Sequence, residues 1–185
     1  MKPATPPSRL RVQKANLMER DPYLTILPQA VRKRTLLVVG SNPPTTSGSR
    51  TLARAEQARS ILEFDKVLIA NLFSVRTYRT GAISSLGSKL QGWADARAAL
   101  LEGLDQSSGV LLGYGVGRPA GKAAWHHDDQ VQWLEMHLRS RELPVWWVGG
   151  APRHPSRWQR YTSRAHPEDA FVIALKKSLQ LRSQL

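Results

Sequence analysis

The stretch Thr35–Gly48, TLLVVGSNPPTTSG, decides the fold. It begins as an apolar run of strand length, passes through Gly40 and two prolines into a loop, and is followed by a helical pattern over Arg50–Phe64. A strand that continues into a loop and a helix is the repeating unit of a parallel α/β sheet. Ligands of such sheets bind beyond the carboxyl ends of the strands, so this loop is a candidate site. Within this loop, Asn42 is the only residue with a side-chain amide.

The rest of the chain repeats this alternation of strand and helix. The apolar runs of strand length are Leu36–Val39, Val67–Ala70, Val110–Leu112 and Val145–Val148. Helical patterns lie between them, and a last helix is predicted from about Pro167. We therefore expect an α/β fold, a three-layer α/β/α arrangement with a four-stranded parallel sheet, in a single domain over residues 35–185. Residues 1–34 are basic and Pro-rich, which predicts an N-terminal arm.

Composition limits the classes of protein and site. The chain has 185 residues and no cysteine, which suits one domain and excludes disulfides, thiolate zinc sites and iron–sulfur clusters. No apolar run approaches membrane-spanning length, and no apolar signal core lies near the start. We expect a cytoplasmic monomer with no membrane partner, no metal and no cofactor. His126, His127, Asp128 and Asp129 resemble a ligand cluster, but neighbours on a helix point in different directions, and His127 falls on the apolar face.

Basic residues exceed acidic ones throughout the chain. The net charge is +13, and residues 35–185 hold 19 Lys or Arg against 12 Asp or Glu. Acidic residues are absent from four segments, each of which contains one predicted strand and the loop at its carboxyl end: 22–55, 66–94, 106–127 and 143–167. The arginines in those loops are Arg50, Arg76, Arg79, Arg118, Arg153 and Arg157. This segregation predicts an anionic ligand at one sheet edge, chiefly nucleic acid. The alternative is a basic surface that serves solubility.

Further motifs follow the other predicted strands. The fourth strand is followed by Arg153, His154, Ser156, Arg157, Trp158 and Arg160. Guanidinium groups suit phosphates, an indole suits base stacking, and a histidine can donate to a developing anion. The second strand is followed by Asn71-Leu72-Phe73, whose amide matches the edge of a base. Each motif alone also fits an ordinary turn or a solvated loop. The glycines of Gly113-Tyr114-Gly115-Val116-Gly117 have the wrong spacing for a dinucleotide fingerprint.

Taken together, the motifs resemble those of an uncharacterised bacterial family. Its members carry N-P-(S/P)-T, N-L-F-x-x-R and P-R-H-P in this order, and the chain has Asn42-Pro43-Pro44-Thr45, Asn71-Leu72-Phe73-Ser74-Val75-Arg76 and Pro152-Arg153-His154-Pro155. The resemblance covers residues 35–161. Through the first loop, the Asn71 motif and His154-Pro155-Ser156, the chain also resembles the uracil-DNA glycosylase superfamily. That resemblance implies excision of a base that has been flipped out of DNA.

The resemblance to the glycosylases also implies residue roles. Asn42 would hold the attacking water, and His154 would stabilise the departing base anion. The base would lie against Gly40, Ser41, Asn71 and Phe73, and the nucleic acid would contact Arg76, Arg79, Arg153, Ser156, Arg157, Trp158 and Arg160. Because an amide is not basic at physiological pH, Asn42 could orient a water molecule but not deprotonate it. The implied partner is DNA rather than RNA, and the base is left open. The alternatives are a non-catalytic nucleic-acid-binding protein and an enzyme that acts on free nucleosides or nucleotides.

Overall fold

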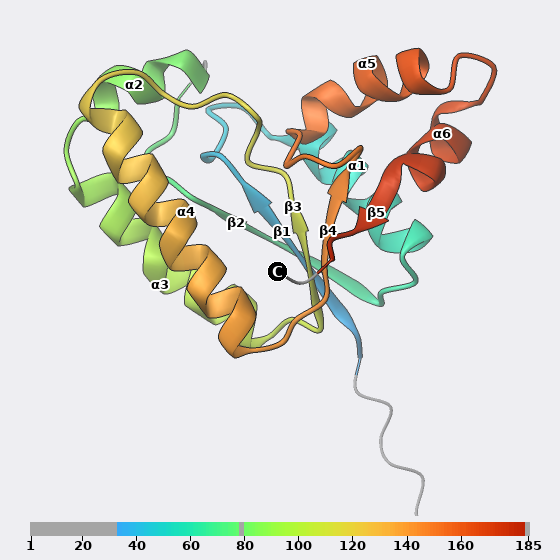
Figure 1. The fold of residues 1–185 in the computed structure, drawn as a ribbon, viewed down its shortest axis with the longest axis horizontal. Helices are drawn as coiled ribbons and strands as arrows, with labels where there is room; N and C mark the ends of the chain where they lie inside the picture. Colours follow the sequence, from blue (N-terminus) through green and yellow to red (C-terminus); the bar gives the residue numbers. More distant parts are fainter. Residues whose placement is uncertain (1–32, 78–79, 184–185) are drawn as a thin grey trace, which may run out of the picture. The chain divides into compact units, whose positions relative to one another are not determined.

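A five-stranded sheet lies at the centre of the computed structural model, which describes residues 33–77 and 80–183 (Figure 1). The strands are β1 (Thr35–Gly40), β2 (Lys66–Asn71), β3 (Gly109–Leu112), β4 (Val145–Val148) and β5 (Leu179–Leu181). Their order is β2-β1-β3-β4-β5; the first four are parallel, and β5 is antiparallel to β4. The predicted α/β class is therefore confirmed. Of the predicted arm, only residues 33 and 34 are among those described.

The predicted number of four strands was wrong, because β5 adds an antiparallel edge strand. Leu179-Gln180-Leu181 is too short to stand out as an apolar run and follows a helix directly. Backbone hydrogen bonds hold it in place: Gly149 N donates to Ser178 O at 2.7 Å, and Arg182 N donates to Val145 O at 2.7 Å. The sheet is therefore mixed, with its parallel part formed by the four strands that the sequence predicts.

The helices cover both faces of the sheet. They are α1 (Ser49–Ile61), α2 (Ile83–Leu86), α3 (Gln91–Asp105), α4 (Lys122–Ser140), α5 (Pro155–Ala165) and α6 (Phe171–Ser178), with a short 3-10 turn η1 (Thr80–Ala82) before α2. In Figure 1, α2, α3 and α4 lie on one side of the sheet and α1, α5 and α6 on the other. The last helix begins at Phe171 rather than Pro167, and the basic loop expected after β4 is the helix α5.

Two apolar cores explain why β1 is an unbroken apolar run. Leu37 and Val39 pack with Trp93, Leu100 and Leu134 from α3 and α4. On the other face, the core consists mainly of Leu36, Val38, Ala55, Ala58, Leu111, Trp158 and Leu175. Every residue of β1 is buried, as expected for a central strand covered on both faces. In the described part of the chain, no helix combines the length and apolar composition that crossing a membrane requires.

Gly149, at the end of β4, is predicted to be the glycine least tolerant of a side chain. It has a φ of 61°, and a Cβ atom there would collide with the ring of Tyr161. We expect Gly149→Ala to lower the free energy of unfolding by about 3–4 kcal/mol, measured by urea denaturation. Gly150→Ala is the matched control: its φ is 73°, but its nearest neighbour is Gln180 Oε1 at 3.7 Å, so we expect a loss of about 1–2 kcal/mol. Equal losses would contradict the collision with Tyr161.

Candidate functional site

The loops after β1 and β2 lie side by side at the carboxyl edge of the sheet. Leu72 N donates to Gly40 O at 2.9 Å, and Phe73 N donates to Ser41 O at 3.0 Å. A further bridge joins Pro44 to Thr77. The pairing of β1 with β2 thus continues past the strands, and it brings the first two sequence motifs together.

The two asparagines of these loops have different surroundings. The Asn71 amide lies against the backbone of Gly40, where an added Cβ would be 2.5 Å from Asn71 Oδ1. This close approach is a reason for glycine at position 40. Asn42 donates from Nδ2 to Pro43 O at 3.1 Å and to Thr77 Oγ1 at 2.9 Å, which leaves Oδ1 as the atom available to a ligand.

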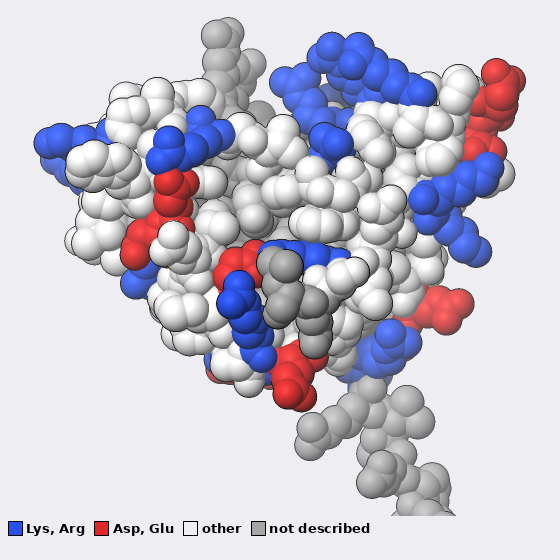
Figure 2. Space-filling view, in the orientation of Figure 1, with Lys and Arg blue, Asp and Glu red and all other residues white. Residues whose placement is uncertain are grey.

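A cavity of about 580 Å³ separates the loop after β3 from α5, and we call it the basic cavity. Its lining residues are Tyr114, Gly115, Val116, Gly117, Arg153, His154, Ser156, Arg157, Arg160, Tyr161 and Arg164. Four of them are arginines and none is acidic. Figure 2 shows Lys and Arg side chains gathered over α5. A pocket with this charge favours phosphate or another anionic group.

Arg153 forms the inner wall of the basic cavity. Its guanidinium lies 4.2 Å from the centre of the Tyr161 ring, and Nη2 is 3.4 Å from Gly149 O. Its Nε is buried and has no hydrogen-bond partner among the described residues. Because buried donors are usually satisfied, this unpaired Nε is an exception among the described residues.

His154 is the N-cap of α5, and this role fixes the state of its imidazole. Nδ1 accepts a hydrogen bond from Ser156 N at 3.2 Å and lies 2.8 Å from Ser156 Oγ. An accepting Nδ1 is unprotonated, so the proton of the neutral ring is on Nε2. Burial, and secondarily the charge of Arg157, lower the pKa of His154 below its usual value. His154 therefore presents a neutral Nε2–H donor at physiological pH.

A second, smaller cavity of about 250 Å³ borders the same loop after β3. We call it the small cavity; Ser41, Leu72, Trp93, Tyr114, Arg118 and His127 are among its lining residues. Tyr114 and Gly117 line both cavities, so this loop is their common wall. Ser41 is the predicted site residue that the small cavity contains. Neither cavity is lined by Asn42 or Asn71.

With this geometry established, comparison with known proteins assigns a family. A family model described as "Protein of unknown function (DUF1643)" matches residues 26–156. The chain belongs to this family. The matched DUF1643 region contains all three motifs and ends at Ser156, so Arg157, Arg160 and Arg164 lie beyond it. Comparisons with curated proteins and with solved structures found no match.

Two aromatic residues predicted to contact the ligand, Phe73 and Trp158, are buried in this structure. Trp158 is fully buried, and its Nε1 donates to Arg153 O at 2.6 Å, so its indole cannot stack on a base. Phe73 is also fully buried, with its ring centre 4.8 Å from that of Trp93. Phe73 packs in the core under α3 and α4, and Trp158 packs in the core on the other face of the sheet. The prediction of direct contact was wrong because these side chains point into the apolar cores.

The arginines expected at this edge differ in availability. Arg157 and Arg160 are exposed on α5, and Arg76 is exposed in the loop after β2. Arg118 is not free: its Nε donates to Asp128 at 3.0 Å, and this bonding holds the pKa of Asp128 below its usual range. Arg79 lies outside the described residues.

Sequence reasoning missed Tyr114 and His127 as site residues of the DUF1643 region. Both line the small cavity, and their rings are 6.3 Å apart, edge to face. The sequence feature that could have pointed to His127 is its position on an otherwise apolar face of the predicted helix. Burial, and secondarily the Glu135 carboxylate, raise the pKa of Tyr114 to about 12 against the opposing charge of Arg182. Within the described residues, no three His, Cys, Asp or Glu side chains gather to hold a metal ion.

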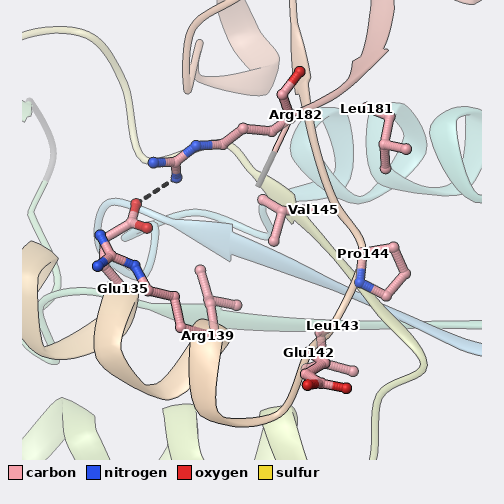
Figure 3. Close-up of a pocket in the computed structure, with 10 residues that line it drawn as sticks. Glu135, Arg139, Glu142, Leu143, Pro144, Val145, Leu181 and Arg182 are labelled. Atoms are coloured by element: carbon pink, nitrogen blue, oxygen red, sulfur yellow. Dashed lines mark hydrogen bonds and ion pairs between the residues drawn. The ribbon is translucent and has the colours of Figure 1, made fainter. Parts of the chain in front are cut away.

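Another cavity, of about 460 Å³, contains none of the predicted site residues (Figure 3). It lies where α4 ends and β4 begins, at the edge of the sheet opposite the motifs. Leu138, Leu143, Pro144, Val145 and Leu181 supply its apolar lining. An ion pair of 2.5 Å between Glu135 and Arg182 spans it, as the dashed line in Figure 3 shows.

Proposed function

We propose that this protein binds DNA along the basic cavity and hydrolyses the N-glycosidic bond of a base flipped out of the strand. The observation that carries the proposal is the lining of the basic cavity, where the described residues include four arginines and a neutral histidine and no acidic residue. Polyanion binding explains the arginines, and stabilisation of a leaving base explains the histidine.

The arginines of α5 are placed to bind a phosphate backbone. Arg157, Arg160 and Arg164 follow a spacing of three and four residues, so they share one face of the helix. All three are exposed, and none forms an ion pair with a described carboxylate. Arg153 lies deeper, beside Tyr161. Phosphates of a single strand would contact the helix face, and the inner arginine would contact the group that enters the cavity.

The chemistry would rest on the leaving group. When the glycosidic bond breaks, the electron pair stays on the base, and the Nε2–H of His154 donates a hydrogen bond to the developing anion. Water adds to the sugar carbon, and the proton that it loses passes through solvent to the departed base anion, which leaves a sugar hydroxyl and a neutral base. Asn42 Oδ1 would orient that water without accepting its proton, because an amide oxygen is not basic. One well-placed donor of this kind is worth roughly 100- to 1,000-fold in rate.

A non-catalytic DNA-binding protein is the second candidate. One observation favours it: Asn42 lines neither cavity, whereas His154 lines the basic one. The Asn42 amide is also engaged with Thr77. A protein that binds DNA without excising a base needs only the arginine face and not the pairing of Asn42 with His154.

Base release decides between the two. Oligonucleotides that carry uracil, hypoxanthine or oxidised pyrimidines are incubated with the protein and then tested for alkali-labile abasic sites. We expect release from at least one of them, and loss of release in Asn42→Ala with DNA affinity retained. Asn42→Asp introduces a group that can accept a proton, so base release by this variant should be at least about tenfold faster than base release by Asn42→Ala.

Binding of DNA without any base release would support the non-catalytic protein. An enzyme that acts on free nucleotides would show much weaker salt dependence of binding than a DNA-binding protein.

A further inference from the structure

We propose that the small cavity binds one neutral, planar heterocyclic ring of nucleobase size through His127, Tyr114 and Ser41. This inference deepens the proposed function and rests on it for the identity of the ring as a flipped base. It assigns base recognition to Tyr114, which lies in the loop before α4, and to His127, which lies on α4.

The lining of the small cavity is mostly apolar and includes a few residues with polar groups. Leu72, Ile83 and Trp93 form its apolar part. The hydroxyls of Ser41 and Tyr114 form no hydrogen bond with any residue in the described part of the chain. Apolar walls with two or three free polar groups are typical of a pocket for a small ligand.

The orientation of His127 is fixed by its neighbours. Its ring meets Trp93 edge to face at 5.9 Å and Tyr114 at 6.3 Å. Nδ1 lies 3.4 Å from Asp128 Oδ1, and Asp128 is held as a carboxylate by Arg118. In the tautomer in which Nδ1 donates to Asp128, Nε2 is an acceptor. With only 17% of its side chain exposed, His127 combines a fixed ring with an unused hydrogen-bonding atom.

Charge and size point to a neutral ring rather than a phosphate. Among the described residues that line the small cavity, Arg118 is the one Lys or Arg, and its charge is balanced by Asp128. The volume of about 250 Å³ is less than half that of the neighbouring basic cavity, at about 580 Å³. The two cavities share Tyr114 and Gly117. A nucleotide whose phosphate lies in the basic cavity would thus have its base within reach of the small one.

The test uses free bases, so that it does not depend on DNA binding. Uracil, hypoxanthine and adenine are titrated into the full-length protein, and binding is followed by calorimetry and by the NMR signals of the histidine rings. We expect at least one base to bind and to shift the His127 signals. His127→Phe keeps an aromatic ring beside Trp93 and removes both nitrogens, so the affinity should fall about tenfold or more. Tyr114→Phe removes a single hydroxyl and should weaken binding by about three- to tenfold.

His137→Phe is the matched control on the same helix. His137 packs on Trp133, with ring centres 4.4 Å apart, and does not line the small cavity, so its replacement should leave base binding unchanged. Absence of binding of every base, or equal binding by the wild type, His127→Phe and Tyr114→Phe, would overturn the proposal. DNA affinity is measured in parallel. DNA binding without base binding would refute the small cavity alone, and base binding without DNA binding would refute the proposed function alone.

Discussion

Replacement of both Arg160 and Arg164 with Glu is expected to reduce the affinity for a DNA oligonucleotide at least about 100-fold at low salt. The two residues line the basic cavity from successive turns of α5, and both are exposed. Their reversal removes two phosphate contacts and adds two repulsive charges. The dependence of log K on log salt should become shallower by about 1.5. Fluorescence anisotropy at several salt concentrations measures both quantities. Arg157 is left unchanged because its charge lowers the pKa of His154.

The control for this experiment has the same net charge. Lys66→Glu with Arg139→Glu also replaces two exposed basic residues by acids, but these lie at the start of β2 and near the end of α4, away from the basic cavity. We expect this variant to lose less than about tenfold in affinity. Similar losses in the two variants would show that total charge, and not the α5 face, governs binding. Circular dichroism of both variants checks that the fold is retained.

The sequence predicted the strands better than the helix that carries the basic cavity. The central strands β1 and β3 are apolar runs because they are buried on both faces, whereas the apolar runs of β2 and β4 are only partly buried. Helix α5 has only Pro155, Trp158 and Thr162 buried, and arginines occupy much of the rest. The buried residues recur at spacings of three and four, and a proline stands at the first turn, so the helical pattern is present in the sequence. The arginines that dominate its composition led to the interpretation of this segment as a basic loop.

The acid-free segments pointed to the edge of the sheet where the basic cavity lies, but they did not give the direction of each side chain. Trp158 and Phe73 follow strands, as a ligand-binding residue would, yet both point inward. Tyr114 and His127 are separated by a loop and the first turn of α4, and only the fold brings their rings together. Which residues lie at an edge follows from the order of strands. Which of them line a cavity depends on packing between residues far apart in the chain.

Replacement of His154 with Asn is expected to reduce base release about 100- to 1,000-fold while leaving DNA affinity within about twofold of the wild type. Asn is a strong N-cap residue, so the start of α5 should be retained and the free energy of unfolding should change little. His154→Ala removes both the donor and the cap, and should also lose about 1 kcal/mol of stability. Rates of release from an oligonucleotide, together with urea denaturation of both variants, separate the two roles.

The pH dependence provides an independent check on the state of His154. Because its folded-state pKa is lowered, the unfolded chain takes up the proton first as the pH falls. The contribution of His154 to stability is therefore complete above about pH 6.5, the pKa of an unperturbed histidine, and is lost as the pH falls through the lower folded-state value. His154→Asn cannot titrate and should lose less stability than the wild type between pH 7.5 and 5.5. Equal losses in the two proteins would contradict a neutral, capping His154, and full base release by His154→Asn would assign the leaving-group contact to another residue.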